Sequence, residues 1–82
     1  MLEFPCDFPI KAFGIASDGF PALVLGIVRR HAPNVGLESL DSRPSSGGKY
    51  QSVTVTIRAE SKAQIDAIYQ DLTDCAEVIM AL

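Results

Sequence analysis

Two short segments of the 82-residue chain carry residue types that could hold an anionic ligand. One is Asp18-Gly19, directly before a helical pattern, and the other is the glycine-rich run 45–49, which ends in a lysine. Free N–H groups at a helix start and in a glycine-rich turn can bind a carboxylate or phosphate. A flexible, solubilising hairpin tip is the alternative interpretation of the second segment. The candidate ligand-binding residues are Asp18, Gly19, Ser45, Ser46, Gly47, Gly48 and Lys49.

The single histidine and the two cysteines are the remaining candidates for chemistry. His31 falls on the apolar side of a helical pattern, so we predict a packed histidine bonded to a backbone carbonyl or to a carboxylate such as Glu60. A thiolate pair of Cys6 with His31 is the alternative, but the sequence offers no third residue to orient it. One histidine and two separated cysteines cannot fill a tetrahedral metal site. We therefore predict no catalytic residues, no metal, no cofactor and no enzyme activity.

The composition argues against two classes of partner. The formal net charge is −3, whereas nucleic-acid-binding domains usually gather a basic surplus, so nucleic acid is not expected. The longest apolar run, residues 22–28, is too short to span a bilayer, and the N-terminus lacks the pattern of a signal peptide. We expect a cytoplasmic protein that binds no membrane. A chain this short forms one domain, residues 1–82, with a modest core, which makes a homodimer a reasonable expectation.

Hydrophobic periodicity predicts four strands and two helices. Alternating patterns indicate strands at residues 8–14 and 50–59, a short polar segment indicates an edge strand at 37–43, and an apolar segment indicates a last strand at 76–82. Apolar residues at helical spacing indicate a first helix that begins at Phe20 and ends before Pro33, and Ser61 with Gln64 has the form of a capping box that opens a second helix.

The order βαββαβ is most simply an α+β ferredoxin-like sandwich, with a four-stranded antiparallel sheet in the order 4-1-3-2 and both helices on one face. This topology puts the loop after the first strand, the 45–49 hairpin and the turn before the last strand at one end of the domain. His31 and Cys6 lie at the other end. Cys6 and Cys75 are then about 20 Å apart, too far for a disulfide.

Two apolar surfaces remain for a partner. Phe13 and Tyr50 are predicted on the open face of the sheet, and Ala22, Leu25 and Gly26 on the outer face of the first helix, where charged residues are usual. A glycine costs about 1 kcal/mol in a helix interior, and close approach of another backbone would explain it. A neutral surface glycine is the equal alternative.

Three segments, Leu2-Glu3-Phe4-Pro5, Arg30-His31-Ala32-Pro33 and Pro44-Ser45-Ser46-Gly47-Gly48-Lys49-Tyr50-Gln51-Ser52-Val53, together resemble the YbeD-like family of small bacterial proteins of unknown function. The resemblance implies a ferredoxin-like fold close to the ACT-type regulatory domains of amino-acid metabolic enzymes. It also implies that Asp18-Gly19-Phe20-Pro21 is similar to the turn with which ACT domains enter their first helix, where a glycine lets a ligand approach the backbone. Acylphosphatases share the topology, but they would require an arginine in the loop 14–19, which has none.

Two functions remain open at this point. The first is a regulatory module of the ACT-like kind that binds a small anionic metabolite at Asp18 and residues 45–49. The second is an adaptor that docks on a partner enzyme through the first helix or the open sheet face.

Overall fold

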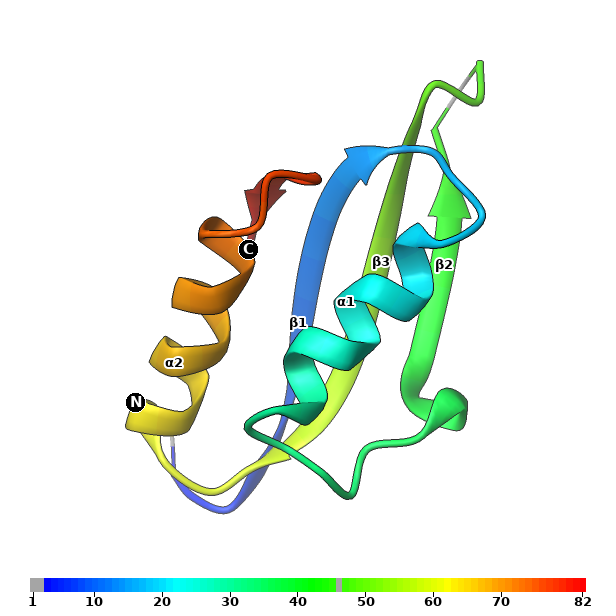
Figure 1. The fold of residues 1–82 in the computed structure, drawn as a ribbon. Helices are drawn as coiled ribbons and strands as arrows, with labels where there is room; N and C mark the ends of the chain where they lie inside the picture. Colours follow the sequence, from blue (N-terminus) through cyan, green and yellow to red (C-terminus); the bar gives the residue numbers. More distant parts are fainter. Residues whose placement is uncertain (1–2, 46) are drawn as a thin grey trace.

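The computed structural model describes residues 3–45 and 47–82, and within them the predicted order βαββαβ is confirmed (Figure 1). In chain order the elements are β1 (Cys6–Ile15), α1 (Phe20–Arg29), the 3-10 helix η1 (Leu37–Ser39), β2 (Leu40–Pro44), β3 (Tyr50–Ala59), α2 (Lys62–Thr73) and β4 (Val78–Ala81). None of the described helices is long and apolar enough to cross a membrane.

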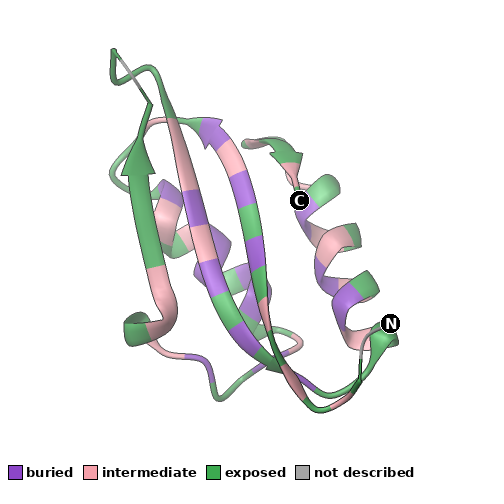
Figure 2. Ribbon diagram, turned by 180° about the vertical axis from the view of Figure 1, so that it is seen from behind, coloured by how far each residue is buried: buried purple, intermediate pink, exposed green. Residues whose placement is uncertain are grey.

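The sheet is antiparallel with the strand order β2-β3-β1-β4, which is the predicted order 4-1-3-2. β1 and β3 form its centre and pair from Cys6 opposite Ala59 to Ile15 opposite Tyr50. Both helices cover the same face, because their apolar residues join one buried cluster with one set of alternating strand residues. Figures 1 and 2 show α1 lying across the sheet and α2 lying beside α1.

Burial alternates along β3 from Ser52 to Ala59, as the sequence pattern predicts (Figure 2). Val53, Val55 and Ile57 are buried beneath the helices, whereas Thr56 and Arg58 are exposed on the other face. The helices contribute the buried residues Phe20, Val24, Leu25, Ile27, Val28, Ile65, Ile68 and Leu72. Neither α1 nor α2 therefore covers the second face of the sheet.

Leu25 is buried, with 7% of its surface exposed, so the prediction that it lies on the outer face of α1 is wrong. The apolar side of α1 is wider than expected because the helix contacts the edge strand β2 as well as β1 and β3. Leu25 belongs to the same cluster as Val35, from the connection that follows the helix. Ala22 and Gly26 are exposed, as predicted.

Three strand boundaries differ from the predicted ones. β1 is longer than residues 8–14, because it pairs with β3 over the whole length of both strands. The segment 37–43 begins as the helical turn η1 and becomes a strand only at Leu40. β4 is shorter than residues 76–82, and it leaves Pro9 outside its register, so the missing N–H of that proline costs no hydrogen bond to β4.

The start of α2 confirms the predicted cap. Ser61 is the N-cap residue, and its Oγ accepts a hydrogen bond from the Gln64 backbone N–H at 3.1 Å. The Gln64 side chain accepts from the Glu60 N–H at 2.7 Å and donates to the carbonyl oxygen of His31 at 2.8 Å. Gln64 thus joins the start of α2 to the turn that follows α1.

Candidate functional site

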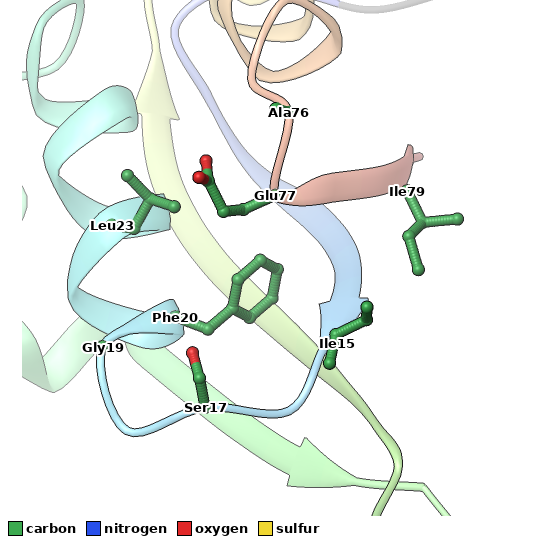
Figure 3. Close-up of a pocket in the computed structure, with 8 residues that line it drawn as sticks. All are labelled: Ile15, Ser17, Gly19, Phe20, Leu23, Ala76, Glu77 and Ile79. Carbon is green, nitrogen blue, oxygen red and sulfur yellow. The ribbon is translucent and has the colours of Figure 1, made fainter.

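A cleft of about 540 Å³ opens between the β1–α1 loop and the α2–β4 turn (Figure 3). Its apolar walls are formed by Ile15 at the end of β1, Phe20 and Leu23 on α1, and Ile79 on β4. Apolar clefts of roughly 300–1,000 Å³ with a few polar groups are the usual form of a small-molecule site. Of the predicted ligand-binding residues, Gly19 lines this cleft.

Gly14 brings the walls of the cleft together. A Cβ atom at this position would lie 2.5 Å from the carbonyl oxygen of Glu77 and 2.5 Å from Cε1 of the Phe20 ring. Only a glycine lets the ring and the α2–β4 turn approach the strand this closely. At the same point the β1–β4 register shifts between Phe13 and Gly14, so one extra β4 residue, Ile79, is left without a partner and is 60% exposed.

The polar groups of the cleft are the Glu77 carboxylate and the Ser17 side chain. Figure 3 shows the Glu77 side chain extending from the α2–β4 turn toward Leu23 and the Phe20 ring. Cys75 Sγ donates a hydrogen bond to Glu77 Oε2 at 3.1 Å, and this bond lowers the pKa of the Glu77 carboxyl. Burial, and then the same hydrogen bond, raise the pKa of the Cys75 thiol. The cleft therefore holds an ionised carboxylate beside a protonated thiol at neutral pH.

The first turn of α1 borders the cleft. Its N-cap residue, Gly19, provides no side-chain cap, and Pro21 in the first turn has no N–H. A Cβ atom on Gly19 would meet nothing within 4 Å, so packing does not require a glycine there. The Phe20 N–H donates to the Ser17 carbonyl oxygen at 3.3 Å, so the helix start offers the cleft mainly the positive end of its dipole, which favours a negative charge.

The predicted glycine-rich site lies apart from the cleft, at the exposed tip of the β2–β3 hairpin (Figure 1). Ser45 closes the hairpin, since its Oγ accepts from the Tyr50 N–H at 3.1 Å and its N–H donates to the Tyr50 carbonyl at 2.7 Å. Gly47 and Gly48 have φ values of +91° and +74°, which the turn itself requires. These contacts account for the residue types without a ligand.

The remaining predicted site residues lie near the hairpin or the cleft without joining a single pocket. Lys49 Nζ is 5.4 Å from the centre of the Tyr50 ring, and the Lys49 carbonyl accepts from the Ala16 N–H at 2.9 Å. That bond places the hairpin and the β1–α1 loop at one end of the domain, as predicted. Asp18 is exposed on the loop, and Ser46 lies outside the described residues. Ligand binding by the hairpin stays a prediction.

The hydrogen-bond partner of His31 is Asp71 rather than Glu60, which corrects the predicted carboxylate. His31 Nε2 and Asp71 Oδ2 are 2.7 Å apart and part-buried, so the residue has the packed role that its helical position indicates. Both Cys6 and Cys75 are free, half-buried thiols. Residues 3–45 and 47–82 contain no cluster of three His, Cys, Asp or Glu side chains that could hold a metal ion.

Sequence reasoning missed most of the cleft. Ile15, Leu23, Glu77 and Ile79 line it, and none was proposed as a site residue. One signal was present, because a glycine inside an alternating strand pattern, Gly14, indicates a bulge or a close backbone approach. The pattern does not say which residues approach.

Comparison with known proteins identifies relatives along the full length of the chain. Residues 1–82 match the family model described as a protein of unknown function, DUF493. A UPF0250 protein of Nitrosomonas europaea is 45% identical over 82 residues, which cover 100% of this chain and 94% of that protein. A UPF0250 protein of Pseudomonas aeruginosa is 45% identical over 82 residues, which cover 99% of this chain and 88% of that protein.

Two solved structures share the fold. The solution structure of protein HP0495 from H. pylori has a TM-score of 0.74 at 13% identity and covers 100% of this chain and 86% of that one. The ACT domain of GTP pyrophosphokinase from Chlorobium tepidum has a TM-score of 0.67 at 12% identity, with 93% and 84% of the two chains covered. These likenesses concern the fold alone, and they confirm the expected closeness to ACT-type domains.

Proposed function

The chain belongs to the DUF493 or UPF0250 family of bacterial proteins of unknown function, and from that premise we propose that it is a cytosolic, non-enzymatic regulatory module of the ACT-like kind. Its ligand binds in the cleft between the β1–α1 loop and the α2–β4 turn. The observation that supports this most directly is the apolar cleft that combines a carboxylate with the start of α1.

The chemistry of the cleft selects the class of ligand. The positive end of the α1 dipole suits an anionic group, which is the part of the ligand expected from the sequence. The Glu77 carboxylate on the opposite wall suits a cationic group. The side chains of Ile15, Leu23 and Ile79 suit an apolar body. A small metabolite with all three parts is an amino acid with an apolar side chain, and that is the ligand class we propose.

A thermal-shift screen of the purified protein tests this proposal. The panel contains apolar amino acids, the corresponding amines and keto acids, and phosphate-bearing metabolites. A ligand at about 100 times its dissociation constant adds about 2.7 kcal/mol, which raises the midpoint of a domain this small by roughly 10 to 20 °C. An amino acid should give this shift, whereas its amine and its keto acid, each lacking one charged group, should give much smaller ones.

Matched variants locate the site. Glu77→Gln removes one charge-assisted hydrogen bond and should weaken amino-acid binding about 10- to 100-fold. Glu60→Gln makes the same change at another exposed glutamate, at the other end of the domain, and should leave binding unchanged. Lys49→Ala tests the hairpin: loss of binding in this variant with retention in Glu77→Gln would move the site to the glycine-rich tip. Absence of any shift across the panel would count against a metabolite-binding role.

The adaptor hypothesis keeps one of its two surfaces. Burial of Leu25 leaves Ala22 and Gly26 as the exposed small residues on α1, which is little apolar area for docking. The open sheet face with Phe13 and Tyr50 remains as the candidate docking surface.

A further inference from the structure

The large apolar side chains that are exposed gather on one side of the molecule. Among the described residues six such side chains are exposed, and five of them belong to β1, β3, β4 and the residue after β4. These five are Ile15, Tyr50, Ile79, Met80 and Leu82, with exposures from 42% to 63%. The sixth, Leu37 in η1, lies away from them.

Strand register shows that this apolar area is continuous. Met80 lies opposite Phe13, and Ile15 lies opposite Tyr50, so these four residues occupy neighbouring rows on the face without helices. Leu82 exchanges both backbone hydrogen bonds with Lys11, at 2.7 and 3.0 Å, and extends the area by one row. We call Phe13, Ile15, Tyr50, Met80 and Leu82, with Phe13 at their centre, the sheet-face patch.

The acidic side chains beside the patch are paired, although the chain as a whole carries −3. Arg43 Nε lies 3.2 Å from Asp41 Oδ2, and Arg58 Nη1 lies 3.3 Å from Asp7 Oδ1, so both carboxylates that the described strands place on this face have a cation beside them. Lys11 Nζ stands 5.8 Å from the centre of the Phe13 ring. A two-fold interface brings each charged side chain near the same side chain of the second copy, and ion-paired charges add little repulsion there. Lys11 is the one cation that the described strands place on this face without a carboxylate partner.

The size and shape of the face also suit a second copy. With strands about 4.8 Å apart and about 3.3 Å per residue, the four strands cover roughly 450–600 Å² before side chains add relief. The smallest specific interfaces bury about 600 Å² per partner. A face that is a nearly regular sheet is complemented best by another sheet, and two sheets stack about 10 Å apart with interleaved side chains.

We infer that the sheet-face patch is the contact surface of a homodimer, in which two copies of this chain pack their helix-free sheet faces together about a two-fold axis. Phe13 and Met80 lie at the centre of the contact, and Arg43 lies at its rim on the edge strand β2. Lys11 lies in the next row along β1, between Leu82 and Thr54. This inference does not rest on the proposed ligand.

Sedimentation equilibrium over a range of protein concentrations tests the inference. The wild-type chain should give twice its monomer mass of 8.8 kDa at high concentration. Met80→Glu places two charges at the centre of the interface, one from each copy, and should raise the dimer dissociation constant about 100-fold or more. Met80 is 50% exposed, so the variant should keep the circular dichroism spectrum and thermal midpoint of the wild-type monomer.

Leu37→Glu is the matched control, because it adds the same charge at an exposed apolar residue outside the patch. It should leave the dissociation constant unchanged. Amide chemical shifts of the wild type, followed during dilution, should change along β1, β3 and β4 and stay constant on α2. A monomer at millimolar concentration would overturn the inference, and so would a dimer that Met80→Glu does not weaken or that Leu37→Glu weakens equally.

Discussion

Gly14 lies in β1 where the Phe20 ring and the Glu77 carbonyl oxygen both approach the strand. Gly14→Ala should lower the free energy of unfolding by about 2–3 kcal/mol, because one obstructing atom belongs to the backbone and the ring is 2% exposed with little room to move. In a domain of this size the thermal midpoint should fall by roughly 10 to 20 °C. Urea unfolding followed by circular dichroism measures the change directly.

Gly26 is the matched control for this substitution. It lies in the exposed part of α1, and a Cβ atom there would meet nothing within 4 Å. Gly26→Ala should therefore stabilise the protein by about 0.5–1 kcal/mol, through the higher helix propensity of alanine. If Gly14→Ala were as harmless as Gly26→Ala, the close approach that forms the cleft would be contradicted.

Cys75 provides a chemical probe of Glu77, to which its thiol donates a hydrogen bond. Burial and the bond to Glu77 raise the pKa of its thiol, so the folded state favours the protonated form. The stabilisation from this shift is present below the ordinary thiol pKa and is lost as the pH rises through the raised value. Glu77→Gln removes the negative charge, so we expect it to lower the pKa of Cys75 and to speed alkylation at a pH of about 8.

The alkylation rate is best measured with iodoacetamide in a Cys6→Ser background, which leaves Cys75 as the single thiol. The pH–rate curve should move to lower pH in the Glu77→Gln variant, while Asp18→Asn, which changes an exposed carboxylate on the β1–α1 loop, should leave it in place. An unchanged curve in Glu77→Gln would contradict the Cys75–Glu77 hydrogen bond.

At the scale of elements, the 2.7 Å bond between His31 and Asp71 joins the turn after α1 to the last part of α2. Removing either side chain should cost about 1 kcal/mol, since the pair is about 30% exposed and partly screened by water. A double-mutant cycle of His31→Ala with Asp71→Ala, followed by urea unfolding, should give a coupling of about 0.5–1 kcal/mol.

Arg30 supplies the control for that cycle. Its Nη1 lies 3.8 Å from the same Asp71 oxygen, but its side chain is 65% exposed. The Arg30–Asp71 cycle should give a coupling of only a few tenths of a kcal/mol. Equal couplings in the two cycles would mean that the His31 bond does not join the helices as described.

The elements also show what sequence patterns can predict. The bounds of β3 and the cap at Ser61 follow from local rules, because strict alternation and a capping residue act within a few positions of the chain. The burial of Leu25 could not be predicted, because it depends on how far α1 reaches across the sheet toward β2. Helical periodicity fixes the direction of an apolar stripe but not its width.

The cleft was less predictable than the fold, because it also depends on contacts between residues far apart in the sequence. Its lining comes from β1, α1 and the α2–β4 turn, which meet only in the folded chain. The sequence pattern predicted a site at the glycine-rich hairpin, but Gly47 and Gly48 there provide the positive φ values that the turn requires. Gly14, which actually shapes the cleft, stands alone in a strand, and an isolated glycine indicates close contact without naming the partner.

At the scale of the whole molecule, the strands of the sheet differ in how regularly they are paired. β1 and β3 are paired over ten positions each, whereas β4 pairs with β1 across a register shift. Amides of β1 and β3 should therefore exchange with solvent only on global unfolding, and those of β4 through a local opening about 1–2 kcal/mol less costly. Native-state hydrogen exchange measures both, with the regularly paired edge strand β2 as the comparison.

The β4 strand carries Ile79 of the cleft and Met80 of the sheet-face patch, so a loosely held β4 lies within reach of both proposed partners. Exchange at β4 amides should slow at high protein concentration, and it should slow again when an amino acid fills the cleft. In Met80→Glu the concentration effect should vanish while the effect of the amino acid remains, because the two surfaces share a strand but not that side chain. If β4 amides exchanged as slowly as those of β3 in the dilute, ligand-free protein, the lower local stability expected for β4 would be contradicted.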